Sequence, residues 1–172
     1  MLEPKKSLGQ NFLIDKNICK KIVNLLDINN CDIIEIGPGT GQISDEILKK
    51  NPKKLTLIEK DNKLYQKLKK KYRNTKNIQI FNIDALKYDY NKHDSSNIIS
   101  NLPYNVSTEI IFYLLNNYNN INELVFMIQK EVADKFDYTN IKKNNKYKFL
   151  MSIFADYKIV FDITNKVFYP NP

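Results

Sequence analysis

Short apolar runs alternate with amphipathic helical patterns along most of this chain, and this alternation limits the possible folds more than any other feature of the sequence. Buried strands are predicted over residues 32–36, 55–58, 78–83, 98–100 and 124–128. Helices are predicted over residues 15–29, 42–50, 62–72, 107–115 and 130–136. Strands that alternate with helices predict an α/β fold with a mostly parallel sheet covered on both faces.

The C-terminal third of the chain is less regular. Residues 139–148 are polar and rich in lysine and asparagine, which predicts an exposed loop before the apolar run 149–154. Two further strands are predicted to end near Phe161 and Val167 and to form an antiparallel edge. With these two strands we expect a Rossmann-like sheet of seven strands in a single domain over residues 1–172.

The charge balance suggests an anionic partner without proving one. The chain carries a formal net charge of +8 at pH 7, which is typical of proteins that bind a nucleic-acid backbone. Lysine supplies almost all of this charge, because Arg73 is the only arginine. A mutational bias toward lysine codons would also produce this balance, so charge alone leaves a binding face and a merely solvated surface equally open.

Simple compositional tests exclude several other classes. No apolar run approaches the roughly 20 residues needed to cross a bilayer. The polar start at residues 1–6 does not resemble a secretion signal, so we expect a cytoplasmic protein, or an organellar one if the source is eukaryotic. Cys19 and Cys31 lack metal-ligand spacing and are expected to be reduced structural thiols. The only histidine, His93, is predicted to be a surface residue, so no metal site is expected.

A glycine-rich turn closes the first predicted strand of the sheet. Residues 35–41 read Glu-Ile-Gly-Pro-Gly-Thr-Gly, with glycines at 37, 39 and 41. Glycines in such a turn allow a ligand to approach the backbone without meeting a Cβ atom. The spacing differs from the G-x-G-x-x-G of dinucleotide folds, in which a pyrophosphate reaches the following helix. This turn therefore favours a ligand without a phosphate group, although a purely structural turn remains open.

Acidic residues follow the next two predicted strands. Glu59 lies 18 residues after Gly41, close to the separation at which a carboxylate binds a ribose diol. Asp61 is better placed to cap the following helix. Asp84 is a candidate acceptor for the amino group of an adenine, with a turn-capping role as the alternative. In an α/β sheet these strand ends meet at the ligand-binding edge.

The sequence Asn101-Leu102-Pro103-Tyr104 at the end of the fourth predicted strand is the most specific feature. An exocyclic amine conjugated to a purine ring is a poor nucleophile. Oxygen acceptors from the Asn101 side chain and the Leu102 backbone would hold its protons and direct its lone pair toward a methyl donor. Tyr104 would stack on the target base, contributing about 1–3 kcal/mol. A plain turn is the alternative.

These motifs together resemble the ribosomal-RNA adenine N6-dimethyltransferases. Residues 6–13, Lys-Ser-Leu-Gly-Gln-Asn-Phe-Leu, are similar to the N-terminal signature of that family. Residues 129–133 match the start of the helix that follows its fifth strand, and residues 168–172 match its aromatic-proline motif. The resemblance implies an S-adenosylmethionine-dependent methyltransferase fold. It also implies a site: Asn11, Leu13, Gly37, Gly39, Glu59, Asp84 and Asn101 at the methyl donor, Asn101 and Tyr104 as catalytic residues, and Phe168 stacking on the target base opposite Tyr104.

Two departures from the family pattern affect the expected RNA contacts. Residues 147–151 lack the glycine and arginine of the family's Tyr-Gly-Arg-Leu-Ser stretch, and Pro172 falls where the family continues into a helical RNA-docking domain. We therefore expect the catalytic domain without that docking domain. Lysines 67, 69, 70 and 71 are interpreted as a solvated helix face, whereas lysines 142, 143 and 146, with Tyr138 and Tyr147 beside them, could follow a phosphate backbone.

The resemblance implies methyl transfer from S-adenosylmethionine to adenines of small-subunit ribosomal RNA during ribosome maturation, by a protein expected to be monomeric. Dimethylation follows from the resemblance only. Large-subunit ribosomal RNA or adenine in DNA stays open as the substrate, because an Asn-x-Pro-aromatic turn serves those enzymes too. A non-catalytic assembly or transcription factor that keeps the fold is an alternative from a different class.

Overall fold

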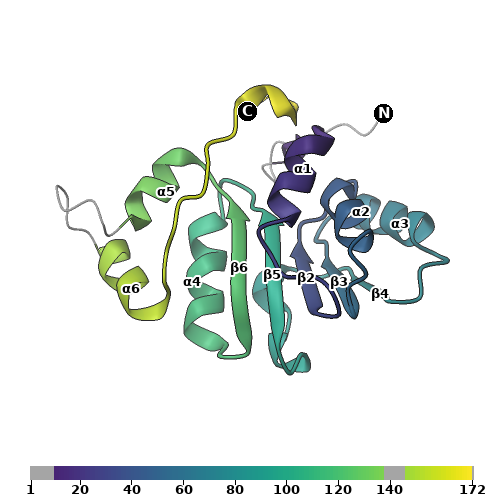
Figure 1. Ribbon diagram of the computed structural model, residues 1–172, viewed down its shortest axis with the longest axis horizontal. Helices are drawn as coiled ribbons and strands as arrows, with labels where there is room; N and C mark the ends of the chain where they lie inside the picture. Colours follow the sequence, from purple (N-terminus) through teal and green to yellow (C-terminus); the bar gives the residue numbers. More distant parts are fainter. Residues whose placement is uncertain (1–9, 138–145, 172) are drawn as a thin grey trace.

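The computed structural model describes residues 10–137 and 146–171, and a five-stranded parallel sheet forms its centre (Figure 1). The strands lie in the order β4-β3-β2-β5-β6, and all neighbouring pairs are parallel. Their bounds are β2 (Asp32–Ile36), β3 (Lys54–Ile58), β4 (Ile78–Phe81), β5 (Ser96–Asn101) and β6 (Ile121–Met127). The order reverses between β2 and β5, which is where open α/β sheets bind their ligands.

Helices cover both faces of the sheet. They are α1 (Lys16–Val23), α2 (Gln42–Leu48), α3 (Asn62–Lys71), α4 (Ser107–Asn117), α5 (Lys130–Phe136) and α6 (Lys146–Phe154). One apolar cluster joins α1, α2 and α3 to the sheet, and a second joins α4, α5 and α6 to its other face. Within the described ranges, no helix is long and apolar enough to span a membrane.

The continuous apolar sequences of the central strands follow from burial on both faces. Ile33 belongs to the cluster under α1 and α2, whereas its neighbour Ile34 belongs to the cluster under α4. Successive side chains of a strand point to opposite faces, so a strand covered on both sides has no polar alternation. The α/β prediction is thereby confirmed. Asp15 caps α1, because its carboxylate accepts from the backbone amides of Asn17 and Ile18.

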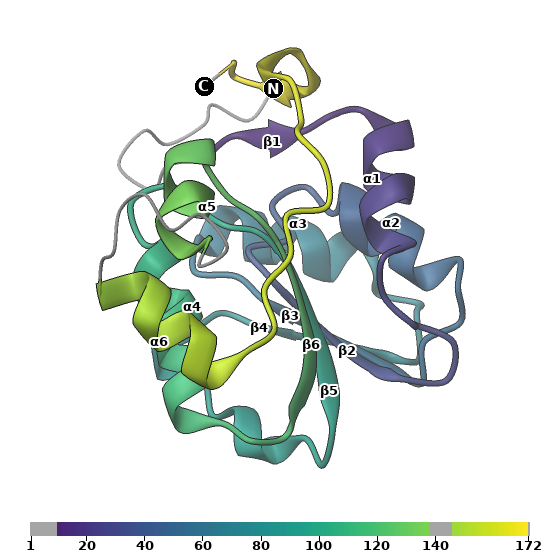
Figure 2. The ribbon, with the colours of Figure 1, turned by 60° about the vertical axis from the view of Figure 1, so that its left-hand side comes forward.

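The prediction of seven strands is not confirmed, because neither of the two late strands joins the sheet in the described part of the chain. Residues 155–164 form no strand, and they extend past β6 toward α1 (Figure 2). Side-chain contacts hold this segment: Tyr157 donates to the Ala133 carbonyl oxygen at 3.1 Å, and the Lys21 ammonium lies 3.7 Å from the Phe161 ring centroid. The apolar run 149–154 belongs to helix α6.

A small second sheet joins the two ends of the described chain. β1 (Phe12–Leu13) pairs antiparallel with β7 (Phe168–Tyr169), with Phe12 opposite Tyr169 and Leu13 opposite Phe168. The Ile14 amide extends this pairing by donating to the Val167 carbonyl oxygen at 2.8 Å. Residues more than 150 positions apart therefore meet above the carboxyl ends of the parallel strands (Figure 2).

His93 is buried, so its prediction as a surface residue is wrong. Its side chain is only 3% exposed, and its Nε2 atom lies 3.0 Å from the Tyr88 hydroxyl group. Burial lowers the pKa of His93 below its ordinary value. Aromatic neighbours rather than the polar local sequence determine this environment. Cys19 and Cys31 are free thiols as predicted, and burial raises the pKa of Cys19 to about 11.

Candidate active site

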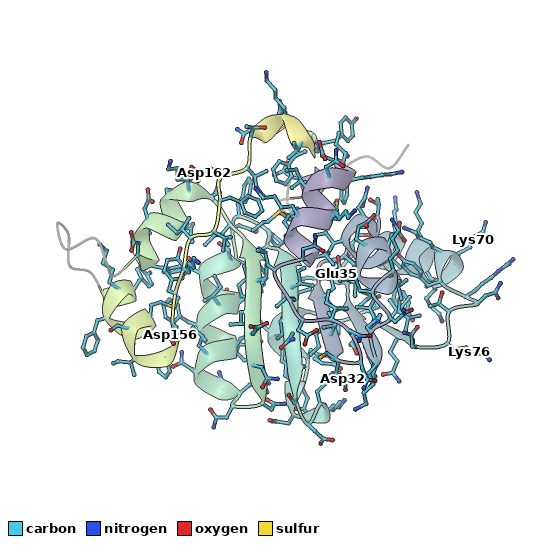
Figure 3. The ribbon with its side chains drawn as sticks, viewed as in Figure 1. Asp32, Glu35, Lys70, Lys76, Asp156 and Asp162 are labelled. Atoms are coloured by element: carbon cyan, nitrogen blue, oxygen red, sulfur yellow. The ribbon has the colours of Figure 1, made fainter. Side chains whose placement is uncertain are left out.

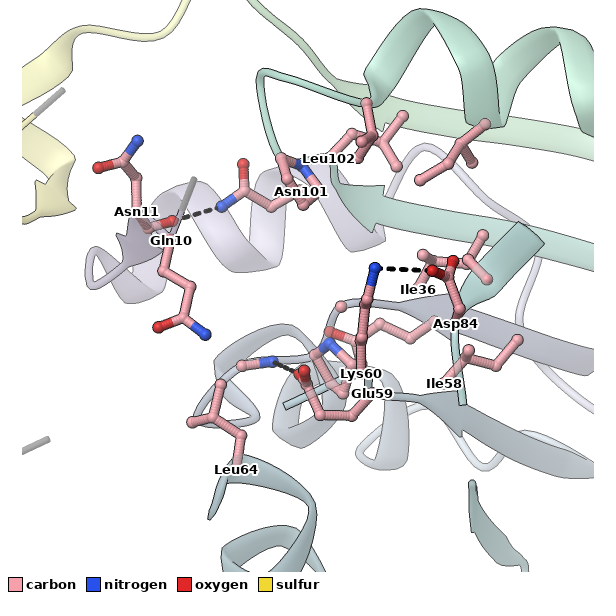
Figure 4. Close-up of a pocket in the computed structure, with 18 of the residues that line it drawn as sticks. Gln10, Asn11, Ile36, Ile58, Glu59, Lys60, Leu64, Asp84, Asn101 and Leu102 are labelled. Carbon is pink, nitrogen blue, oxygen red and sulfur yellow. Dashed lines mark hydrogen bonds and ion pairs between the residues drawn. The ribbon is translucent and has the colours of Figure 1, made fainter. Parts of the chain in front are cut away.

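A cavity of about 320 Å³ opens at the carboxyl ends of the central strands (Figure 4). This volume lies within the range of small-molecule sites. The lining comes from the segments 10–13, 35–43, 58–64, 83–86 and 101–110. It contains every residue that the sequence assigned to the methyl donor: Asn11, Leu13, Gly37, Gly39, Glu59, Asp84 and Asn101. The sheet thus brings together residues that are up to 90 positions apart in the chain.

The glycine turn needs glycine for two different reasons. Gly37 and Gly39 both adopt left-handed backbone angles, with φ of +64° and +60°. At Gly39 space is also short, because a Cβ atom there would lie 2.9 Å from a ring carbon of Phe12. The turn is held in place from α3, where the Tyr72 hydroxyl donates to the Gly41 carbonyl oxygen at 3.0 Å and Lys71 reaches the same oxygen at 3.2 Å. Tyr72 and Lys71 carried no local sequence signal for this contact.

Glu59 connects the glycine turn to the end of β3. One carboxylate oxygen accepts from the Gly39 backbone amide at 3.2 Å, and the other accepts from the Asp61 amide at 2.8 Å. Burial raises the pKa of Glu59 to about 7, although these backbone donors favour its ionised form. Each oxygen keeps a further lone pair, so the carboxylate can still accept from two hydroxyl groups. Asp61 caps α3, as predicted.

Glu35 is the most deeply buried acid of the cavity wall and lies near the centre of the molecule (Figure 3). The Ser44 hydroxyl donates to its carboxylate at 2.5 Å. Burial raises the pKa of Glu35 to about 8, because no neighbouring cation compensates the loss of water sufficiently. This cavity therefore holds two carboxyl groups that titrate near neutral pH.

The raised pKa of Glu35 predicts a pH-dependent stability. The folded chain keeps a proton on Glu35 up to about pH 8, whereas the unfolded chain loses it near 4.5. Stability from this proton is complete below pH 4.5 and is lost as the pH rises through 8. We expect the thermal unfolding midpoint of a Glu35→Gln variant to fall less steeply between about pH 5 and about pH 8 than that of the unmodified chain. Identical profiles in scanning calorimetry would contradict this assignment.

Asp84 already has partners among the other residues that line the cavity. One carboxylate oxygen accepts from the Leu86 amide at 3.0 Å, and the other pairs with the Lys60 ammonium at 2.7 Å (Figure 4). Burial raises the pKa of Asp84, but the hydrogen bond and charge of Lys60 outweigh it and leave the pKa below its ordinary value. The structure is therefore compatible with Asp84 as a turn cap and with Asp84 as an acceptor for an adenine amine. The capping bond uses one carboxylate oxygen, and the other faces the Lys60 ammonium group. Lys60 itself was not singled out from the sequence.

The Asn-Leu-Pro-Tyr turn forms the wall opposite Glu59. Asn101 is the last residue of β5, and its side-chain amide donates to the Asn11 carbonyl oxygen at 2.7 Å. The Leu102 amide donates to the Met127 carbonyl oxygen at 3.1 Å, which ties the turn to the end of β6. Tyr104 is half-buried, and burial raises the pKa of its hydroxyl group.

Phe168 lies outside the cavity lining. It pairs with Leu13 in the small sheet and packs against the apolar cluster that contains Leu13. Stacking of Phe168 on a target base stays a prediction. Of the lysines, Lys70 projects outward from α3 (Figure 3), which agrees with a solvated helix face. Lys71 departs from that prediction, because its ammonium pairs with the Asp45 carboxylate at 2.7 Å and reaches the glycine turn. Lys142, Lys143 and Tyr138 lie outside the described residues.

Comparison with known proteins places this site in a family. A family model described as ribosomal RNA adenine dimethylase matches residues 1–172. The chain belongs to this family. It is 43% identical over 172 residues to the ribosomal RNA small subunit methyltransferase A of Malacoplasma penetrans, covering 97% of this chain and 61% of that protein. The protein of the same name from Pelagibacter ubique is 42% identical, with 99% of this chain and 67% of that protein covered.

Solved structures agree with this family membership. A dimethyladenosine transferase from Plasmodium falciparum has a TM-score of 0.83 and 26% identity, with 94% of this chain and 59% of that chain covered. The 23S rRNA methyltransferase ErmE shares the fold, with a TM-score of 0.83 and 21% identity over 94% of this chain and 65% of that one. The present chain thus spans about three fifths to two thirds of the length of these proteins.

Proposed function

We propose that this chain transfers methyl groups from S-adenosylmethionine to the exocyclic amine of adenine in ribosomal RNA. One observation carries the proposal: the Asn101–Tyr104 turn, the glycine turn and Glu59 line the same cavity. A glycine turn or an Asn-x-Pro-Tyr turn alone has many structural uses. Because both turns line one cavity, a methyl donor and an aromatic amine could bind there side by side.

The lining residues suit S-adenosylmethionine. Gly37 leaves open space beside the backbone, and the Glu59 carboxylate, which accepts from the Gly39 amide, would repel a phosphate at the glycine turn when it is ionised. Glu59 would accept from the ribose hydroxyl groups, and Asp84 would accept from the adenine amine once Lys60 moves away. When bound, the donor supplies an electrophilic methyl group on a sulfonium centre.

The target amine would lie at Asn101. The Asn101 side-chain oxygen and the Leu102 carbonyl oxygen would accept the two amine protons, which directs the nitrogen lone pair away from the base plane. Tyr104 would stack on the base and fix its plane. The cavity needs no general base, because the nitrogen becomes acidic on methylation and releases its proton to water.

The substrate class comes from the relatives. Two relatives more than 40% identical over nearly the whole chain carry the name ribosomal RNA small subunit methyltransferase A. We therefore propose small-subunit ribosomal RNA as the substrate and two successive transfers to each adenine. The net charge of +8 is compatible with an RNA backbone.

Transfer of labelled methyl groups tests this proposal. Small-subunit particles that lack the modification, free large-subunit ribosomal RNA and DNA are each incubated with the chain and labelled S-adenosylmethionine, and modified bases are identified after digestion. We expect N6,N6-dimethyladenine in the small-subunit sample. Label found only in the large-subunit RNA or only in the DNA would identify that nucleic acid as the substrate instead. Donor binding without label in any sample would support the non-catalytic alternative.

A further inference from the structure

The side-chain amide of Asn101 has a fixed orientation. Its nitrogen donates to the backbone carbonyl oxygen of Asn11 at 2.7 Å, and Figure 4 shows its oxygen pointing away from Asn11. An asparagine amide has one donor end and one acceptor end, and rotation by about 180° exchanges them. Because a carbonyl oxygen can only accept, this hydrogen bond is lost when the amide turns over. Asn11 therefore selects one of two orientations of Asn101.

This selection matters for the proposed function, on which the present inference rests. An exocyclic amine can be held only by acceptors at its protons, so the Asn101 oxygen must face the amine. In the opposite orientation the Asn101 nitrogen would direct its hydrogens at the hydrogens of the amine. The amide nitrogen therefore needs another acceptor, and the Asn11 carbonyl oxygen fills that role in this chain.

The position of the Asn11 carbonyl group depends on the small sheet. Asn11 directly precedes β1, whose pairing with β7 is extended by the bond from the Ile14 amide to the Val167 carbonyl oxygen at 2.8 Å. The Asn11 side chain adds a second attachment, because its nitrogen can donate to the Pro170 carbonyl oxygen at 3.2 Å.

We propose that the antiparallel pairing of residues 12–14 with residues 167–169 positions Asn101 for methyl transfer, through the main-chain carbonyl group of Asn11. Asn11 is then a positioning residue whose backbone, rather than only its side chain, serves the reaction. The C-terminal segment thereby acts on Asn101 without lining the cavity, since neither Val167 nor Phe168 contributes to its wall.

Ile14 allows a matched pair of variants. Its side chain is 52% exposed, so Ile14→Ala removes surface atoms and keeps the backbone amide. Ile14→Pro removes the amide proton that bonds to Val167, and the preceding Leu13 is already in a strand, which is the conformation that a following proline favours. We expect Ile14→Pro to lower the single-turnover rate of methyl transfer at saturating donor by about tenfold or more. Because Asn11 and Leu13 also line the donor cavity, donor affinity should fall too, but by a clearly smaller factor than the rate. Ile14→Ala should stay within about twofold in both quantities.

A structural measurement decides the inference independently of activity. In the unmodified ¹⁵N- and ¹³C-labelled chain, we expect a through-hydrogen-bond coupling between the Asn101 side-chain nitrogen and the Asn11 carbonyl carbon in NMR spectra. An Asn101→Ser variant assigns the signal by its loss. Ile14→Pro should abolish the coupling or reduce it strongly, and Ile14→Ala should preserve it.

The possible failures are distinguishable. Absence of the coupling in the unmodified chain would overturn the inference, even if methyl transfer is observed. A normal transfer rate in Ile14→Pro with the coupling lost would also overturn it, as would a parallel loss of donor affinity and rate, which would indicate general unfolding of the site. An unmodified chain that binds donor and methylates nothing would contradict the proposed function, and the coupling would still test the position of Asn101.

Discussion

Replacement of Asn101 by alanine is expected to lower the rate of methyl transfer by about a thousandfold, while the dissociation constant for S-adenosylmethionine changes by less than about threefold. The alanine variant lacks the oxygen that accepts an amine proton, so the target nitrogen keeps its planar, poorly nucleophilic form. We expect donor binding to depend mainly on the glycine turn and Glu59, which lie on neighbouring strand ends. Single-turnover methylation and titration calorimetry measure the two quantities separately.

Asn116→Ala is the matched control for this variant. Asn116 lies on the exposed side of α4, and its amide donates to the Phe112 carbonyl oxygen. The same chemical change there should leave both the rate and the donor affinity unchanged. If Asn101→Ala reduces donor affinity and rate by equal factors, Asn101 holds the shape of the cavity and does not position the amine.

Replacement of Glu59 by glutamine is expected to weaken donor binding by about one hundredfold. The carboxylate oxygens already accept from the Gly39 and Asp61 amides, and each would accept one ribose hydroxyl group as well. Glutamine keeps the volume but offers only one oxygen, and its amide nitrogen would face a backbone N–H group. Both the ribose contacts and the attachment of the glycine turn are therefore weakened.

A donor analogue separates these two contributions. S-adenosylhomocysteine and its 2′,3′-dideoxy analogue are titrated into the unmodified chain and into Glu59→Gln. We expect the substitution to weaken the binding of S-adenosylhomocysteine strongly. The factor by which it weakens the binding of the dideoxy analogue should be at least ten times smaller. Equal losses for both ligands would show that Glu59 acts only by holding the turn at Gly39.

Periodicity along the chain was sufficient to identify the central elements. The apolar runs at 32–36 and 55–58 became β2 and β3, because strands buried on both faces need apolar residues at successive positions. The first helix is shorter than predicted. The apolar pattern predicted a helix to residue 29, but the helix ends at Val23, and Leu26 and Ile28 are buried outside it. Buried residues beyond the end of the helix thus produced the apolar spacing of a longer helix.

The candidate site was predictable to the extent that it follows strand ends. Gly39, Glu59 and Asn101 come directly after or at the ends of three parallel strands, and a parallel sheet brings all such ends to one edge. No local pattern identified Tyr72 as a support of the glycine turn or Lys60 as the partner of Asp84. These contacts depend on how α3 and the strand ends pack, which neighbouring residues do not encode.

The sequence by itself determined the α/β alternation, the glycine turn and the strand-end residues Glu59, Asp84 and Asn101, because each depends on local spacing combined with the rules of parallel sheets. Asn11 and Leu13 were implied by the family resemblance alone. Only the tertiary structure decided which distant segments meet. It buried His93 among aromatic rings, kept residues 155–164 out of the sheet, and paired β1 with β7 so that the Asn11 carbonyl group meets Asn101. Such contacts are selected by complementary packing between whole elements, and hydrophobic periodicity contains no information about the partner that a given edge or side chain will find.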